Sequence, residues 1–181
     1  MKIFKERKNA ELPKFATEGS ACFDVVACLD VGDGITTYNP HQKKIVNPVK
    51  NSRNGPVFAV QPQFRALIPT GLIFNVPSGH VIKMYPRSGM SLKFGITLAN
   101  NVGVIDSDYV EETFVILYNI SDTPVSIFHG DRIAQAMLEK TINYEIEEAK
   151  RKPYQKSERN SGFGSTGIHS EEVEKTFSET S

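Results

Sequence analysis

Up to about residue 142, the apolar residues of this chain fall into short runs that Pro, Gly and Asn residues interrupt. Runs of this length, rich in Val, Ile, Leu and Phe, are typical of β-strands. Many short strands separated by turn residues predict an all-β fold, either a sandwich or a barrel. The runs cover residues 2–4, 19–27, 44–46, 57–60, 65–69, 71–77, 81–86, 113–120, 125–128 and 133–138.

Two segments differ from the other runs. Residues 88–94 have fair helix propensity, and Ser88 is expected to cap a short helix whose N-terminus suits a phosphate. Residues 113–120 are apolar on both sides, so this strand is expected to run through the core. The sequence therefore predicts one short helix among the strands.

The hydrophobic pattern ends near Asn143, where Glu, Lys, Arg, Ser and Gly take over. Because so polar a segment cannot form its own core, residues 143–181 are predicted to be a flexible C-terminal arm and residues 1–142 the β domain. Turn formers dominate residues 29–62, which predicts an insertion made of extra hairpin strands.

Charge and cysteine content exclude several classes of protein. Twenty-one Lys and Arg residues balance 21 Asp and Glu residues, which argues against a nucleic-acid-binding protein. No apolar run is long enough to cross a bilayer, so we expect no membrane association and a cytoplasmic location. Cys22 and Cys28 lack metal-site and redox spacing, and we expect both to be buried free thiols.

The segment 100–109 is predicted to form a hairpin-like turn that carries two carboxylates and a tyrosine. Asp106 is either a general base acting on water or a solvated turn residue, and the sequence alone leaves both open. A calcium loop has little support, because Val110 and Glu111 stand where the EF-hand pattern needs Asp or Asn and then Gly. No His lies nearby in sequence to support a Ser-His-Asp system.

Phosphate-binding chemistry is concentrated in a second segment. Arg87 offers a guanidinium fork, Ser88 a hydroxyl, and Gly89 a backbone that a ligand can approach closely. Gln135 is suited either to donate its amide to a phosphate or to satisfy a neighbouring strand. These residues predict an anion site if the fold brings them together.

Other charged residues leave two interpretations open. Asp24 lies within a short apolar run and is either an acid lining a site or a cap at the end of a strand. Asp131 and Arg132 are expected to form a structural pair or a charge at a strand end.

The segment 162–167 resembles a phosphate-binding loop but is not a Walker A motif, because Ile168 and His169 stand where Lys and Ser or Thr are required. Its glycines would still let backbone N–H groups approach phosphate oxygens, and Ser165 and Thr166 add hydroxyl donors. Phe163 offers a ring that can stack on a base. A flexible linker is the alternative for this segment.

Taken together, five ordered segments resemble those of the trimeric dUTP pyrophosphatases (dUTPases). Some compact viral members of that family elaborate the region that corresponds to residues 29–62, which leaves a phage origin open. The resemblance covers essentially the whole chain. The segments are Gly19-Ser20-Ala21 through Asp24, Pro86-Arg87-Ser88-Gly89, Gly103-Val104-Ile105-Asp106-Ser107-Asp108-Tyr109, Gly130-Asp131-Arg132-Ile133-Ala134-Gln135 and Gly162-Phe163-Gly164-Ser165-Thr166-Gly167.

The resemblance implies a distorted jelly-roll β-fold, a homotrimer with sites shared between subunits, and Mg²⁺-dependent hydrolysis of dUTP to dUMP and pyrophosphate. This reaction would keep uracil out of DNA and supply dUMP for dTMP synthesis. Asp106 would activate the water that attacks the α-phosphorus. Tyr109 would lie under the deoxyribose, where a 2′-hydroxyl has no room.

The remaining roles that the resemblance implies concern binding. The turn would read uracil, Asp24 would hold a metal-bound water, and the arm would close over the substrate. Uracil contacts would come from Asn100, Gly103, Val104 and Ile105, phosphate contacts from Arg87, Ser88, Gly89 and Gln135, and arm contacts from Arg159, Phe163, Gly164, Ser165 and Thr166.

Two residues depart from the family pattern. Glu111 stands where the family usually has Gly after the acidic turn, so the effect on the exit of the turn stays open. Arg159 lies one residue closer to Gly162 than usual, which leaves its phosphate contact open.

Two competing functions are weaker. A dCTP deaminase shares the fold, but Ile116 occupies the position where those enzymes carry a catalytic Glu. A non-catalytic regulatory binding protein of the same fold is disfavoured because Asp106 and the arm segment are both intact.

Overall fold

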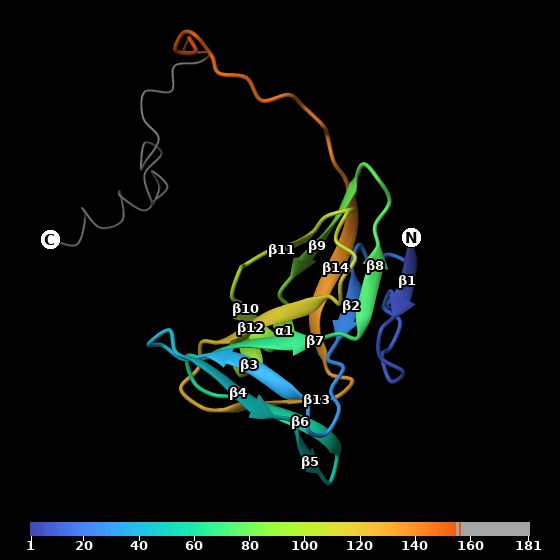
Figure 1. The fold of residues 1–181 in the computed structure, drawn as a ribbon, viewed down its shortest axis with the longest axis vertical. Coiled ribbons are helices and arrows are strands. Elements are labelled where there is room, and N and C mark those ends of the chain that lie inside the picture. Colours follow the sequence, from blue (N-terminus) through green and yellow to red (C-terminus); the bar gives the residue numbers. More distant parts are fainter. Residues whose placement is uncertain (155, 157–181) are drawn as a thin grey trace, which may run out of the picture. The chain divides into compact units, whose positions relative to one another are not determined.

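The computed structural model describes residues 1–154 and 156, and within them it contains fourteen strands and one helix, α1 (Ser88–Phe94). All of these elements belong to a unit that spans Met1–Asn143. The predicted all-β fold with one short helix is therefore confirmed (Figure 1). No helix in this described part is long and apolar enough to cross a membrane.

The largest sheet has five antiparallel strands in the order β10-β12-β7-β3-β4. Its central strand is β7, flanked by β12 and β3, and its two edges are β10 and β4 (Figure 1). The strands are β3 (Gly34–Tyr38), β4 (Lys44–Pro48), β7 (Arg65–Pro69), β10 (Ile96–Leu98) and β12 (Phe114–Asn119).

A second antiparallel sheet has the order β11-β9-β14-β2. Its register places Asp24 opposite Gln135, and Gln135 opposite Tyr85. Three residues on adjacent strands therefore form one row across the sheet, which matters for the site below. The strands are β2 (Phe23–Val26), β9 (His80–Tyr85), β11 (Gly103–Ile105) and β14 (Arg132–Lys140).

Two small sheets complete the unit. In one, β1 (Lys2–Lys5) pairs with β8 (Leu72–Asn75). In the other, the order is β13-β6-β5, with β5 (Lys50–Ser52), β6 (Gly55–Val60) and β13 (Val125–Phe128). Residues 29–62 thus contain two hairpins, β3–β4 and β5–β6.

Alternating burial along the strands builds the core. In β2, Phe23 and Val25 are buried while Asp24 and Val26 are only half-buried, as expected for a strand with one face toward the core. Burying such apolar side chains contributes about 1.5–3 kcal/mol each. The most completely buried large residues include Phe74, Leu29, Ile68, Leu72, Ile82, Ile96, Leu117, Ile127 and Ile133.

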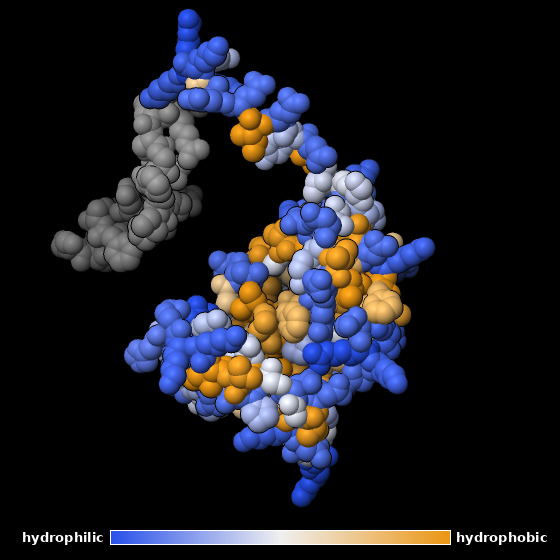
Figure 2. Space-filling model, viewed as in Figure 1, coloured by the Kyte–Doolittle hydropathy of each residue, from blue (hydrophilic) through white to orange (hydrophobic). Residues whose placement is uncertain are grey.

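The prediction that residues 113–120 run through the core with both faces buried is wrong for the single chain. Val115 and Leu117 are buried, but Phe114 and Ile116 are exposed by 37% and 38%. The pattern could not show this, because an apolar side chain in a sequence does not reveal whether its own chain covers it. Apolar side chains do reach the surface of this unit (Figure 2).

Other local predictions need correction. The segment 100–109 is not a paired hairpin, because β10 pairs with β12 in one sheet and β11 with β9 in another. Ser88 is not the cap of α1: the N-cap is Arg87, whose side chain makes no capping bond. The strand expected over 19–27 is confined to Phe23–Val26.

The expectation for the two cysteines holds in part. Both are free, but only Cys28 is buried, whereas Cys22 is half-buried. Burial raises the pKa of Cys28 to about 11, so this thiol is neutral at ordinary pH.

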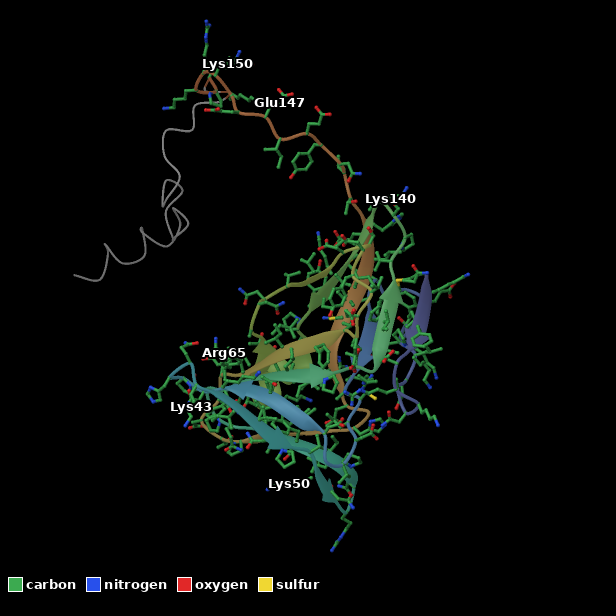
Figure 3. All side chains as sticks on the ribbon, viewed as in Figure 1. Lys43, Lys50, Arg65, Lys140, Glu147 and Lys150 are labelled. Carbon is green, nitrogen blue, oxygen red and sulfur yellow. The ribbon has the colours of Figure 1, made fainter. Side chains whose placement is uncertain are left out.

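The region 29–62 contains an exposed sheet edge, β4, whose residues other than Ile45 are all exposed. Lys43 and Lys50 flank this strand, and both side chains are exposed (Figure 3). Arg65 lies on the neighbouring part of the sheet, with its guanidinium 5.7 Å from the centre of the Tyr38 ring. No Asp or Glu occurs between Asp33 and Asp106, so this surface has a basic character.

Candidate functional site

A pocket of about 370 Å³ lies where the row across the β9-β14-β2 sheet meets the start of α1. Segments far apart in sequence converge here because β14 pairs with both β2 and β9, and because β9 leads directly into Pro86 and Arg87. The pocket is lined by Ala16, Ser20, Ala21, Cys22, Asp24, Arg87, Ser88, Gly89, Arg132 and Gln135.

Two guanidinium groups share one carboxylate in this pocket. Arg87 Nε lies 2.9 Å from Asp24 Oδ1, and Arg132 Nη1 lies 3.4 Å from Asp24 Oδ2. Arg87 Nη1 also donates to the Arg132 carbonyl oxygen at 2.9 Å, which ties α1 to β14. Two positive charges against one negative charge leave the pocket with a net positive charge, which suits an anion.

Asp24 therefore lines the site, and the interpretation of it as a strand-end cap is wrong. Asp131 and Arg132 do not pair with each other: Asp131 Oδ2 accepts the Phe128 N–H at 2.8 Å, while Arg132, the charge at the start of β14, contacts Asp24. Sequence analysis missed Arg132 as a site residue. Only the β14–β2 register, with its irregularity between Arg132 and Ala134, brings it beside Asp24.

The start of α1 supplies backbone donors to the pocket. Ser88 and Gly89 are its first helical residues, and the first N–H groups of a helix have no partner within the helix. Gln135 Nε2 donates to the Pro86 carbonyl oxygen at 3.0 Å, so Gln135 holds the turn before α1 in place. Because an amide has two N–H hydrogens, Gln135 can still present one toward the pocket.

The half-buried thiol of Cys22 also lines the pocket. Burial, together with the negative charge of Glu139, raises the pKa of Cys22. The thiol is therefore protonated at neutral pH and adds no negative charge to the pocket.

The turn after β11 carries Asp106 away from this pocket. Asp106 is exposed, and within the described residues its side chain has no hydrogen-bond partner. The Tyr109 N–H donates to the Asp106 carbonyl oxygen at 3.3 Å, and the Tyr109 hydroxyl donates to the Glu112 carbonyl oxygen at 3.0 Å. Tyr109 lines a separate pocket of about 330 Å³ with Glu111, Glu112 and Phe114 among others.

The predicted uracil-reading residues lie on the same exposed turn. Asn100 and Val104 are exposed, whereas Ile105 is buried and anchors the end of β11. Asn101 adopts a φ of 59°, a left-handed conformation that Asn tolerates better than most residues. A side chain at Gly103 would come within 3.3 Å of Met84, so the backbone lies close to β9 here.

One chain does not bring the acidic turn and the pocket together. Strands β11 and β2 are the opposite edges of the four-stranded sheet, so Ile105 lies three strands and three residues from Asp24. With about 4.8 Å between strands and about 3.3 Å per residue, this separation is roughly 17 Å. That distance exceeds the reach of an Asp106 side chain.

The predicted arm residues Arg159, Phe163, Gly164, Ser165 and Thr166 lie outside the described residues. In the part of the chain that is described, no three His, Cys, Asp or Glu side chains gather as a metal site. Among the described residues, Asp24 is the one carboxylate that lines the pocket. Mg²⁺ commonly uses one or two carboxylates, substrate phosphates and water, so a single acid beside an anion pocket fits this metal.

Comparison with known proteins identifies the family of this chain. The family model "dUTPase" matches residues 56–167. Similar curated proteins are the deoxyuridine 5′-triphosphate nucleotidohydrolases of Desulfotalea psychrophila, 34% identical over 91% of this chain and 92% of the relative, and of Finegoldia magna, 37% identical over 89% and 94%.

Solved structures show the same fold. A Staphylococcus bacteriophage 80alpha dUTPase variant with dUpNHpp has a TM-score of 0.71 at 18% identity, covering 92% of this chain and 98% of that one. The Streptococcus mutans dUTPase has a TM-score of 0.59 at 23% identity, covering 77% and 91%. Since the family model matches more than half of the chain, and relatives above 30% identity match nearly all of it, this chain belongs to the dUTPase family.

Proposed function

We propose that the protein hydrolyses dUTP to dUMP and pyrophosphate. The observation that best supports this proposal is the positively charged pocket at the start of α1. Its side chains include Arg87, Arg132, Asp24 and Gln135. Support comes from relatives of this name that match about nine-tenths of the chain, and from the bacteriophage structure that holds the analogue dUpNHpp.

In this proposal the pocket holds the triphosphate. Arg87 offers charged donors, and Ser88 and Gly89 offer backbone N–H groups at the start of α1. Gln135 keeps the preceding turn in place through Pro86 and directs its second amide hydrogen to a phosphate oxygen. These donors make the departing pyrophosphate a better leaving group, because they stabilise the negative charge that develops on it.

Asp106 acts as the general base. It accepts a proton from a water whose oxygen then bonds to the α-phosphorus, while the bond from that phosphorus to the bridging oxygen breaks and pyrophosphate leaves. An exposed carboxylate without a side-chain partner in the described part of the chain suits this role, because no other group competes for its lone pairs.

The exposed turn reads the nucleoside. Asn100, Gly103, Val104 and Ile105 present backbone groups to uracil, and Tyr109 lies under the deoxyribose. A ring in that place excludes a 2′-hydroxyl by its volume, which selects deoxyribonucleotides over ribonucleotides.

Mg²⁺ is the proposed cofactor, and Asp24 would hold it through water. When bound, the ion neutralises charge on the phosphates. Asp24 is half-buried between Arg87 and Arg132, so its position is fixed by the chain itself. The arginines can pair with phosphates as well as with Asp24, so both kinds of contact fit one pocket.

A homotrimer with shared sites would solve the separation between base and pocket. Asp106 of one chain would complete the pocket of another, with Arg159, Phe163, Gly164, Ser165 and Thr166 of the arm closing over the substrate. The exposed apolar side chains Phe114 and Ile116 on β12 offer a surface for such packing. The roles in dUMP supply and the cytoplasmic location stay predictions.

Product analysis with dUTP, dCTP, dTTP and UTP in the presence of Mg²⁺ tests the proposal. We expect rapid pyrophosphate release from dUTP and little from the other three. Ammonia released from dCTP would instead identify a deaminase. Tight dUTP binding without turnover would identify a binding protein.

A further inference from the structure

An ion-pair network that the proposed reaction does not use joins three distant parts of the chain. Arg7 Nε donates to Glu112 Oε1 at 2.9 Å, and Arg7 Nη1 forms an ion pair with Asp33. The Arg7, Glu112 and Asp33 side chains are only 23%, 15% and 28% exposed. Water therefore screens these charges less than it screens surface pairs.

The backbone fixes Arg7 in its place. The N–H groups of Glu6 and Arg7 both donate to the Gly71 carbonyl oxygen, at 2.9 Å and 3.3 Å. Gly71 has a φ of 68°, and a side chain there would lie 2.7 Å from the Ala10 Cβ atom and 2.9 Å from the Cys28 sulfur. Only glycine permits this close approach of the N-terminal segment.

Glu112 is equally constrained. Its Oε1 atom accepts the Gly71 N–H at 2.9 Å in addition to the Arg7 guanidinium. The next residue, Thr113, donates its N–H to the Leu72 carbonyl oxygen at 2.8 Å. Glu112 is therefore the first firmly held residue after the acidic turn, because residues 106–111 are all exposed.

The same residue holds the proposed sugar-reading ring. The Glu112 carbonyl oxygen accepts the Tyr109 hydroxyl at 3.0 Å, and the Tyr109 N–H in turn bonds to the Asp106 carbonyl oxygen. A chain of contacts thus runs from Arg7 through Glu112 and Tyr109 to Asp106. A shift of Glu112 would move the ring and the base together.

We infer that Arg7 is a positioning residue: through its ion pairs with Glu112 and Asp33, it fixes the exit of the acidic turn and so places Tyr109 and Asp106. This inference rests on the proposed function for its catalytic consequence. Neither Glu112 nor Asp33, the two side chains that Arg7 contacts, lines the positively charged pocket. Loss of Arg7 should therefore weaken nucleoside recognition and lower kcat through the displaced Asp106, while phosphate binding stays unchanged.

Electrostatics indicates why Arg7 matters more than a surface arginine. The carboxylates of Glu112 and Asp33 raise the pKa of Arg7 even though burial alone would lower it. Without Arg7, two partly buried acids would face each other with no cation between them, and repulsion would push Glu112 away from Gly71. A lysine could restore one charge but not both directed contacts.

The test uses the full-length protein with Arg7→Ala, Arg7→Lys and Glu112→Gln. Lys8→Ala is the matched control, since Lys8 is a neighbouring exposed cation without an ion pair in the described residues. For each variant, KM and kcat are measured with dUTP and UTP, and inhibition is measured with dUMP and with pyrophosphate.

Arg7→Ala should raise KM for dUTP and weaken dUMP inhibition about tenfold, the scale of one lost charged hydrogen bond. The preference for dUTP over UTP should fall with it, while pyrophosphate inhibition stays within about twofold of wild type. Arg7→Lys should recover part of the loss. Glu112→Gln should give an intermediate effect, because its amide oxygen can still accept the Gly71 N–H.

Hydrogen exchange provides a readout that does not depend on turnover. Arg7→Ala should speed amide exchange in residues 106–112 and leave β9 and β14 unchanged, whereas Lys8→Ala should change neither. A lower Tm with unchanged selectivity and unchanged exchange in the turn would overturn the positioning role. A wild-type protein that releases no pyrophosphate from dUTP would refute the proposed function, and exchange would then decide the inference alone. If Arg7→Ala does not fold, Arg7→Lys and Glu112→Gln decide it.

Discussion

The phosphate pocket and the acidic turn are built on opposite principles, although both belong to the same four-stranded sheet. The pocket sits on the paired strands β2 and β14, and its charged side chains bond to one another. The turn follows the edge strand β11, and Asp106 is exposed without a side-chain partner in the described residues. One region has its charged side chains paired within a single chain, whereas the carboxylate of the other is open to solvent.

This difference has a chemical reason. Binding a polyanion requires donors whose positions are fixed before the ligand arrives, and a network of Arg87, Asp24 and Arg132 provides that. A general base needs a free lone pair, so hydrogen bonds within its own chain would compete with the water it must activate. The turn is instead stabilised by the hydrogen bond from the Tyr109 hydroxyl to the Glu112 carbonyl oxygen, which does not use the Asp106 carboxylate.

The largest expected effect comes from the turn. Asp106→Asn should keep the shape of the turn but remove the base, lowering kcat by roughly 10²–10⁴-fold. Pyrophosphate inhibition should not change, because the pocket lacks Asp106. Steady-state kinetics with dUTP measures both quantities. A kcat near wild type would show that Asp106 is not the base.

The pocket should respond differently. Arg87→Ala removes the 2.9 Å ion pair to Asp24 and the bond to the Arg132 carbonyl oxygen, so kcat/KM for dUTP should fall by about 10–100-fold and pyrophosphate inhibition should weaken in parallel. The control is Lys93→Ala, an exposed cation in the last turn of α1. Equal losses in both variants would mean that general charge, and not this pocket, attracts the substrate.

Mixing the two impaired variants tests whether base and pocket come from different subunits. Asp106→Asn and Arg87→Ala chains are unfolded together and refolded, with a tag on one variant to confirm mixed trimers. In a random equal mixture, about a quarter of the sites would combine an intact turn with an intact pocket, so activity should return to roughly that share. Mixed trimers as inactive as their parents would place the whole site within one chain.

The smallest expected effect lies between the two regions, where Lys83 and Tyr85 on β9 bond to Glu139 on β14. The bond from Lys83 lowers the pKa of Glu139 below the usual value for a glutamate. A lowered folded pKa stabilises the fold above the unfolded value and loses that contribution as pH falls through the folded value. Glu139→Gln should therefore lower Tm slightly at neutral pH and flatten its fall below pH 4.5, so that variant and wild type converge in acid. Unfolding scans at several pH values measure this, and an unaltered acid slope would contradict it.

Local chemistry made much of the fold predictable. Short apolar runs with Pro and Gly boundaries predicted the strands, and the propensities of residues 88–94 predicted α1 at its observed position. The resemblance of the five segments to a known family predicted that Asp24, Arg87 and Gln135 lie in one site. The pocket does bring these three residues together.

The sequence could not predict which residues lie opposite each other on paired strands. Arg132 reaches Asp24 only because of the register between β14 and β2, and register depends on contacts between distant segments. The Arg7–Glu112 contact spans 105 positions and carries no local signal. The exposed side of β12 was missed because Phe114 and Ile116 have the same apolar character as Val115 and Leu117.

The exposed edge strand β4 has a consequence for how the protein behaves at high concentration. An open strand edge offers free N–H and C=O groups to a strand from another molecule, which is a common route to aggregation. Lys44 brings a charge to the beginning of β4, and Pro48 at its end has no N–H to donate. Lys44 and Pro48 therefore make the open edge of β4 a poorer template for strand addition by a neighbouring molecule.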